Sequence, residues 1–164
     1  MIRACSAQDF DSIFEIINDA ACAYKGVIPA DRWKEPYMPR KALQAELDAG
    51  VCFSGFEQHG QLQAVMGSQQ VQDVTLIRHA YTRTQERGKG LGKQLLQHLR
   101  KKTDRSILIG TWRAADWAVE FYQKQGFRLV SEEEKNRLLR KYWQIPDRQI
   151  ETSVVLVDRS AQES

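Results

Sequence analysis

Three glycines alternate with other residues in one short stretch of the chain, Arg87-Gly88-Lys89-Gly90-Leu91-Gly92-Lys93. The stretch follows a predicted strand and precedes an apolar helical pattern, so the glycines occupy a turn and the first winding of a helix. Backbone N–H groups point outward there, and the helix dipole and three cationic side chains add positive potential. The stretch therefore predicts a phosphate or pyrophosphate site, although glycine-rich turns also serve as plain tight connections.

Two other phosphate-binding motifs fit this stretch poorly. A Walker-type loop has four residues between its glycines and ends in Gly-Lys-Ser/Thr, but Gln94 follows Lys93 and offers no hydroxyl for magnesium. A dinucleotide fingerprint has the spacing Gly-x-Gly-x-x-Gly early in a βαβ unit, whereas the spacing here is Gly-x-Gly-x-Gly. The spacing excludes the first motif and disfavours the second.

A second motif follows the glycine turn, in the run from Ala118 to Phe127 that reads AVEFYQKQGF. Arg87-x-x-Gly90-x-Gly92 and this run resemble the Arg/Gln-x-x-Gly-x-Gly/Ala and Ala-x-x-Phe-Tyr-x-x-x-Gly-Phe motifs of the GNAT superfamily of N-acetyltransferases. The resemblance is clear over residues 51–130 and looser before them. It implies an enzyme that uses acetyl-CoA and holds the CoA pyrophosphate in the glycine turn.

The resemblance also assigns residues to the cofactor. The strand that ends at residues 80–82 would pair its backbone with the pantetheine amides, and one of its N–H groups would polarise the thioester carbonyl. Many family members have Asn where this chain has Ala115, so a side-chain contact to pantetheine is expected to be missing. The implied cofactor-binding residues are Ala80, Tyr81, Thr82, Arg87, Gly88, Lys89, Gly90, Leu91, Gly92, Lys93, Ala115, Ala118 and Tyr122.

Tyr122 is the predicted catalytic residue, because it matches the family tyrosine that protonates the CoA thiolate. A phenol with a pKa near 10 keeps its proton at neutral pH. The alternative is that Tyr122 only packs with its aromatic neighbours on the helix. No general base stands out, although His79 or Asp73 could relay a proton through water, and members of this superfamily often have no dedicated base.

The acceptor, a small-molecule or peptide amine, is expected at the loop over residues 25–39, which Gly and Pro interrupt. Its aromatic side chains would either form walls of a substrate pocket or pin the loop to the core. Its acidic residues could attract a cationic amine. The candidate substrate residues are Tyr24, Asp31, Trp33, Tyr37 and His79.

Alternating helix and strand patterns must position these residues. The patterns predict a three-layer α/β/α fold with a mixed, mostly antiparallel sheet, classed as α/β or α+β. The expected strands are 2–5, 51–56, 63–71, 74–82, 106–112, 127–130 and 152–157. The expected helices are 7–24, 40–49, one ending at Lys102, 115–125 and a helical insertion after Ser131 that ends before Pro146.

The inserted helix raises two further expectations. Acidic residues 132–134 lie in its first turn, where they favour a dipole-complementing role over attraction of a cationic amine. Its basic face, Arg137-Arg140-Lys141, could instead bind a partner protein. The last strand, residues 151–158, could pair across a two-fold axis and give a homodimer.

Composition limits the remaining possibilities. A length of 164 residues suits one domain, 1–164, and 24 basic against 21 acidic residues do not indicate nucleic-acid binding. Three separated cysteines and three scattered histidines favour a reducing compartment and no metal site. Without a leader pattern or a long apolar run, the protein is expected in the cytoplasm, away from membranes. A CoA-binding sensor that transfers nothing remains the alternative.

Overall fold

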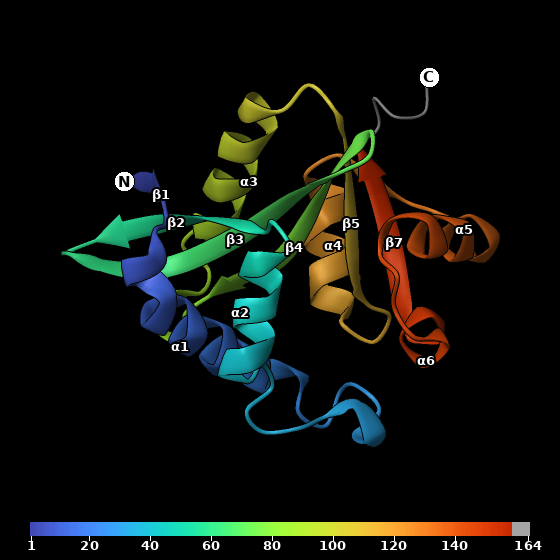
Figure 1. Ribbon diagram of the computed structural model, residues 1–164, viewed down its shortest axis with the longest axis horizontal. Helices are drawn as coiled ribbons and strands as arrows, with labels where there is room; N and C mark the ends of the chain where they lie inside the picture. The colour runs from blue at the N-terminus through green and yellow to red at the C-terminus, as the bar shows by residue number, and fades with distance from the viewer. Residues whose placement is uncertain (159–164) are drawn as a thin grey trace. The chain divides into compact units, whose positions relative to one another are not determined.

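The structure, a computed structural model, describes residues 1–158, and within this range seven strands form a mixed sheet in the order β1-β2-β3-β4-β5-β7-β6 (Figure 1). The predicted α/β class is confirmed. The strands are β1 Ile2–Ala4, β2 Cys52–Gln58, β3 Gln61–Val71, β4 Val74–Thr82, β5 Ser106–Trp112, β6 Phe127–Leu129 and β7 Ser153–Asp158. The α-helices are α1 Phe10–Ala21, α2 Arg40–Asp48, α3 Leu91–Lys102, α4 Asp116–Lys124, α5 Glu132–Tyr142 and α6 Asp147–Glu151.

Contacts within the chain group its residues into two compact units. Unit 1 contains Met1–Gln69 and Ile77–Asp104, and unit 2 contains Gln70–Leu76 and the chain from Arg105 onward. The glycine turn and the predicted acceptor loop therefore belong to unit 1, whereas the predicted catalytic tyrosine belongs to unit 2.

In unit 1, α1 buries the apolar stripe that its three- and four-residue spacing predicts. The stripe packs against α2 and against strand β2, which pairs antiparallel with both β1 and β3 (Figure 1). Each fully buried aliphatic side chain stabilises such a core by about 1.5–3 kcal/mol. The side chains of α1, α2 and β2 that are at most 4% exposed in this core are Ile13, Ile16, Ile17, Leu43 and Phe53.

The predicted capping box is present, but it caps a short 3-10 helix, Ala7–Asp9, that leads into α1. Ser6 and Asp9 form this box, and the Ser6 N–H donates to the Asp9 carboxylate at 2.8 Å. Both terminal nitrogens of Arg3 donate to the same carboxylate at 2.9 Å. These contacts hold the pKa of Asp9 at about 2, chiefly through the hydrogen bond with Arg3.

In unit 2, β7 pairs antiparallel with β5 on one side and with β6 on the other. Both edges of the strand are therefore hydrogen-bonded, and the expectation that the last strand pairs across a two-fold axis is wrong. The predicted helical insertion between β6 and β7 is confirmed as α5, and the short helix α6, which the sequence patterns did not predict, follows it.

The insertion is tied down by buried polar contacts. Lys135 is only 2% exposed, and its ammonium donates to the Ile150 carbonyl at 2.8 Å and pairs with Glu132 at 3.4 Å. At the other end of α5, the Tyr142 hydroxyl donates to the Asp73 carboxylate at 2.8 Å. Asp73, which the sequence suggested as a proton relay, is thus engaged in holding α5.

The acidic run 132–134 stabilises α5 through local contacts. Ser131 caps the helix by accepting a hydrogen bond from the Glu134 N–H at 3.2 Å. Acidic side chains in a first helical turn also complement the dipole. The run makes ion pairs with the basic residues Arg113, Arg128, Lys135 and Arg137. This arrangement agrees with the structural role that the sequence favoured.

Neither a membrane span nor a metal-binding cluster is found within residues 1–158. No helix in this range combines the length and the apolar character needed to cross a membrane. The same range contains no group of three or more His, Cys, Asp or Glu residues that could hold a metal ion. Cys5, Cys22 and Cys52 are free thiols.

Candidate active site

The glycine turn lies where β4 leads through a short 3-10 helix, Thr84–Glu86, into α3. Gly88 has a φ of 80° and Gly90, the N-cap of α3, a φ of 78°. Both angles are in the left-handed region, which side chains other than glycine rarely adopt. A Cβ atom built on either residue meets nothing within 4 Å, so the turn faces open space.

The first turn of α3 leaves its backbone donors available for an anion. No side chain caps Gly90, and the first turn of the helix contains no acidic residue. Leu91 is buried, which anchors the helix on its apolar side, while Lys93 is exposed. Outward N–H groups, a positive dipole end and open space beside two glycines together suit a diphosphate.

Polar contacts with α1 hold the segment that enters the turn. The Thr84 N–H donates to the Asp19 carboxylate at 2.8 Å. The Arg83 guanidinium donates to Glu15 at 2.6 Å and, through Nε, to the Leu62 carbonyl at 2.8 Å. Because these contacts reach one helix and one strand of unit 1, the start of the turn has a fixed position in that unit.

Two of the predicted phosphate-facing cations have partners within unit 1. The Arg87 guanidinium donates to the Ala20 carbonyl of α1 at 3.2 Å. The Lys89 ammonium pairs with the Glu86 carboxylate at 2.7 Å. Arg87 thus also fastens the turn to α1.

The end of β4 is bent at His79, which has a φ of 57°. The bend brings the Arg78 carbonyl toward β3, where a Cβ atom on Gly67 would lie 2.7 Å from it, so this position requires glycine. Neighbouring residues of a regular strand point to opposite faces. Here the side chains of both Arg78 and His79 reach Glu46 of α2, at 3.3 Å and 3.4 Å.

His79 is consequently held among unit 1 side chains. Its ring stacks on Phe53 with the centroids 6.3 Å apart. Burial would raise the pKa of the Glu46 carboxyl, but the adjacent His79 imidazole and the Arg78 guanidinium lower it below its ordinary value. The structure thus gives the predicted substrate residue His79 a carboxylate partner.

The predicted substrate residues Tyr24, Trp33 and Tyr37 do come together, and Tyr81 of β4 joins them. These four rings form an aromatic cluster. Trp33 stacks on Tyr37 with centroids 5.9 Å apart and an interplanar angle of 27°. Tyr37 contacts Tyr24 at 5.4 Å, and Tyr24 contacts Tyr81 edge-on at 6.3 Å. The cluster therefore connects the predicted acceptor loop to the strand assigned to pantetheine.

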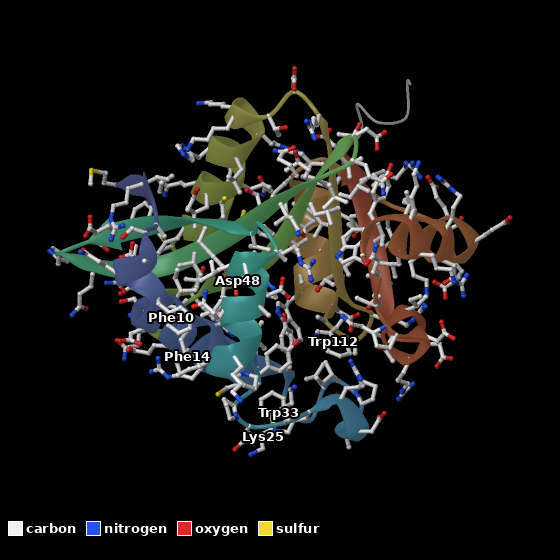
Figure 2. The ribbon with its side chains drawn as sticks, viewed as in Figure 1. Phe10, Phe14, Lys25, Trp33, Asp48 and Trp112 are labelled. Atoms are coloured by element: carbon white, nitrogen blue, oxygen red, sulfur yellow. The ribbon has the colours of Figure 1, made fainter. Side chains whose placement is uncertain are left out.

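The far end of this loop is fastened to α1 by one amide side chain. Asn18 accepts from the Met38 N–H at 2.8 Å and donates to the Met38 carbonyl at 3.0 Å. Met38 itself is 8% exposed and packs in the core below α1 and α2. Lys25 and Trp33 lie in the loop beyond α1 (Figure 2).

The charged residues of the loop are mostly exposed. Asp31 is exposed in the 3-10 helix Ala30–Arg32. Lys25 pairs with Glu35 at 3.2 Å, with both side chains more than 60% exposed. Exposed pairs of this kind contribute at most about 1 kcal/mol.

In unit 2, Tyr122 lies on α4 and is 6% exposed. Its ring packs edge-on against Phe121 at 5.1 Å and Phe127 at 6.0 Å. Ala115 is fully buried at the N-cap of α4, and its carbonyl accepts from the Ala118 N–H at 3.0 Å. The motif residues Ala115, Ala118 and Tyr122 thus share one helix and its cap, and the aromatic packing expected as the alternative role of Tyr122 is present.

The sequence did not point to the residues that hold the site. Glu15, Asn18 and Asp19 lie on the polar side of α1, and Glu46 lies on α2. Their partners are 20 to 68 residues away in the chain. Polar residues on the exposed side of an amphipathic helix are ordinary, so only the polar face itself could have indicated them.

Comparisons with known proteins agree with this fold. The fold and the two motifs define an acyltransferase. The chain belongs to the acetyltransferase (GNAT) domain family, whose pattern matches residues 18–140. No sequence among curated proteins matches the chain significantly.

Solved structures confirm the fold. A GNAT-family acetyltransferase from Staphylococcus aureus is 14% identical, with a TM-score of 0.71 and 96% and 97% of the two chains covered. The PaiA N-acetyltransferase of Thermoplasma acidophilum, in complex with coenzyme A, is 14% identical, with a TM-score of 0.67 and the same coverage. The ribosomal-protein-S18-alanine N-acetyltransferase of Escherichia coli is 16% identical, with a TM-score of 0.67 and 96% and 92% covered.

Proposed function

We propose that this acyltransferase moves the acetyl group of acetyl-CoA to the primary amine of a small molecule or peptide. The observation that carries the proposal is the turn at Gly88–Gly90, where two left-handed glycines leave open space beside the uncapped N-terminus of α3. A diphosphate fits such a turn because backbone donors and the dipole stabilise its charge. A structural neighbour in complex with coenzyme A supports the choice of cofactor.

The proposed reaction is a direct transfer. The neutral amine nitrogen attacks the thioester carbonyl carbon, and the C–N bond forms as the C–S bond breaks. A backbone N–H of residues 80–82 stabilises the negative charge on the carbonyl oxygen. The amine loses one proton to water, the departing thiolate receives one from the Tyr122 hydroxyl, and the resulting phenolate regains a proton from water.

Tyr122 is suited to this role by its chemistry. A phenol has an ordinary pKa near 10 and can donate its proton to a thiolate, and the Tyr122 side chain is shielded from bulk water by burial. The role itself rests on the motif resemblance. His79 is proposed as a substrate-side residue rather than a base, because its imidazole is engaged with Glu46 and Phe53.

One experiment tests the proposal in two stages. Calorimetry should show acetyl-CoA binding, and acetyl-CoA with a panel of primary amines should then release free thiol. Binding without thiol release from any amine is the behaviour of a CoA sensor and contradicts the transfer reaction. Absence of binding contradicts the assignment of the glycine turn. Cell fractionation would test the cytoplasmic location that the sequence suggests, and sedimentation would test whether the protein forms a homodimer.

A further inference from the structure

The aromatic cluster has the composition of a binding surface as well as of a packing contact. All four of its residues are partly exposed, and Tyr37 and Tyr81 also pack against the buried core of unit 1. Two of them, Trp33 and Tyr37, stack at 27°, which presents flat apolar surface. The cluster continues through Tyr24 to Tyr81 on β4. It therefore has an indole end in the loop and a phenol end at the strand.

The phenol end is polar but uncharged. The Tyr24 side chain is hydrogen-bonded to that of Tyr81. Burial raises the pKa of Tyr24, although the hydrogen bond with Tyr81 and the charge of Arg87 act in the opposite direction. Phenol oxygens can accept a hydrogen bond from an amine without contributing a full negative charge.

The charges around the cluster do not favour a polycation. Arg87 is close enough to act electrostatically on Tyr24 and would repel a second ammonium group. In the loop, the Glu35 carboxylate is paired with Lys25. At the start of α2, Arg40 pairs with Asp11 at 2.6 Å. Recognition therefore falls mainly to the rings.

We infer that the acceptor is a primary amine carried on an aromatic or similarly flat apolar body, which packs against the indole end of the cluster and directs its amino group to the phenol end. This inference rests on the proposed function, because the resemblance assigns the pantetheine arm to the strand that contains Tyr81. Rings bury apolar area and stack at little conformational cost, so they select the body of such a molecule.

The test compares small amines as acceptors in the thiol-release assay. 2-Phenylethylamine should give a kcat/KM at least tenfold above those of propylamine, spermidine and an alanine-initiated tripeptide. Trp33→Ala should raise the KM for 2-phenylethylamine at least tenfold and leave the KM for acetyl-CoA unchanged. Trp143→Ala is the matched control, since it removes a partly buried indole of unit 2 outside the cluster and should change neither KM.

A second variant separates the two ends of the cluster. Tyr24→Phe keeps the ring and removes the hydroxyl, so it should lower kcat/KM for every amine about threefold to tenfold without changing the preference among them. A preference for spermidine or the tripeptide, or an unchanged amine KM in Trp33→Ala, would overturn the inference.

Binding distinguishes this inference from the proposed function. Calorimetry should show that 2-phenylethylamine binds the protein–CoA complex and that Trp33→Ala weakens this binding at least tenfold. If that binding occurs but no amine releases thiol, the transfer reaction is wrong and the ligand class stands. If thiol is released with other amines and 2-phenylethylamine does not bind, the ligand class is wrong.

Discussion

The glycine turn and the acceptor loop are both fastened to the C-terminal part of α1, but by different chemistry. Asp19 accepts from the backbone of Thr84 at the start of the turn, and its neighbour Asn18 brackets the backbone of Met38 at the end of the loop. Beyond these anchors, the turn exposes backbone, whereas the loop exposes aromatic side chains. Backbone groups can bind a cofactor that many enzymes share, whatever the side chains around it. An acceptor that is particular to one enzyme requires particular side chains to recognise it.

Blocking the turn should have the largest effect. Gly90→Val places a branched side chain on a residue with a φ of 78° and into the space assigned to the diphosphate. Acetyl-CoA affinity measured by calorimetry should fall about 100-fold, which corresponds to about 2.8 kcal/mol. Gly60→Val is the control, because Gly60 has a φ of 77° and open space around it but lies in the β2–β3 hairpin. Equal losses of acetyl-CoA affinity in Gly90→Val and Gly60→Val would contradict the assignment of the cofactor to the glycine turn.

Tyr122→Phe should separate cofactor binding from chemistry. If the backbone of the turn holds the cofactor, this variant keeps its acetyl-CoA affinity. If the Tyr122 hydroxyl protonates the thiolate, kcat falls at least tenfold, equivalent to about 1.4 kcal/mol. Steady-state kinetics with a saturating amine checks this. Unchanged turnover would remove Tyr122 from the mechanism and leave it as a packing residue beside Phe121 and Phe127.

Substitutions of the two neighbouring anchors in α1 should each raise the KM of a different substrate. Asp19→Ala removes the acceptor of the Thr84 N–H and should raise the KM for acetyl-CoA about threefold to tenfold, in line with the 0.5–2 kcal/mol typical of lost caps. Asn18→Ala leaves both polar groups of Met38 without their partner and should raise the KM for the amine by a similar factor. The measurement is the pair of KM values for each variant. Both variants raising the same KM would show that the two regions are not held separately.

The smallest effect is expected from the charged contact at the other end of α1. Arg3 lowers the pKa of Asp9 to about 2, so the ionised pair stabilises the fold above pH 4, and this stability is lost as the pH falls toward 2. Arg3→Gln should lower the melting temperature by about 2–4 °C at pH 7, for a loss of about 1 kcal/mol. The difference from wild type should shrink below pH 3, and acetyl-CoA affinity at pH 7 should not change. A changed affinity would mean that contacts anywhere on α1 affect the turn.

Much of the fold could be predicted because it depends on residues that lie close together in the sequence. The period of α1, the Ser6–Asp9 capping box just before it and the glycines of the turn all act within a few residues. The left-handed His79 could not be predicted, because its conformation depends on the strand partners and on Gly67 rather than on its own type. The position of β7 between β5 and β6 was missed for a related reason, since strand spacing does not specify which edges pair.

The site divides in the same way. Gly88 and Gly90 were predicted because a backbone requirement restricts the residue type. Tyr24, Trp33 and Tyr37 were singled out as aromatic residues in an irregular loop, and the structure brings them together. Asp19 and Thr84 are 65 residues apart, and no pattern along the chain relates them.

The adjacent anchors Asn18 and Asp19 make α1 a shared support for the acceptor loop and the glycine turn, the two segments proposed to bind substrates. A small rotation of this helix about its axis would displace the loop and the turn at once, because consecutive side chains of a helix move together. Substitutions in the buried stripe beneath, such as Ile17→Val, can therefore alter recognition of donor and acceptor in parallel without touching either molecule. The helix couples two specificities through its seating in the core.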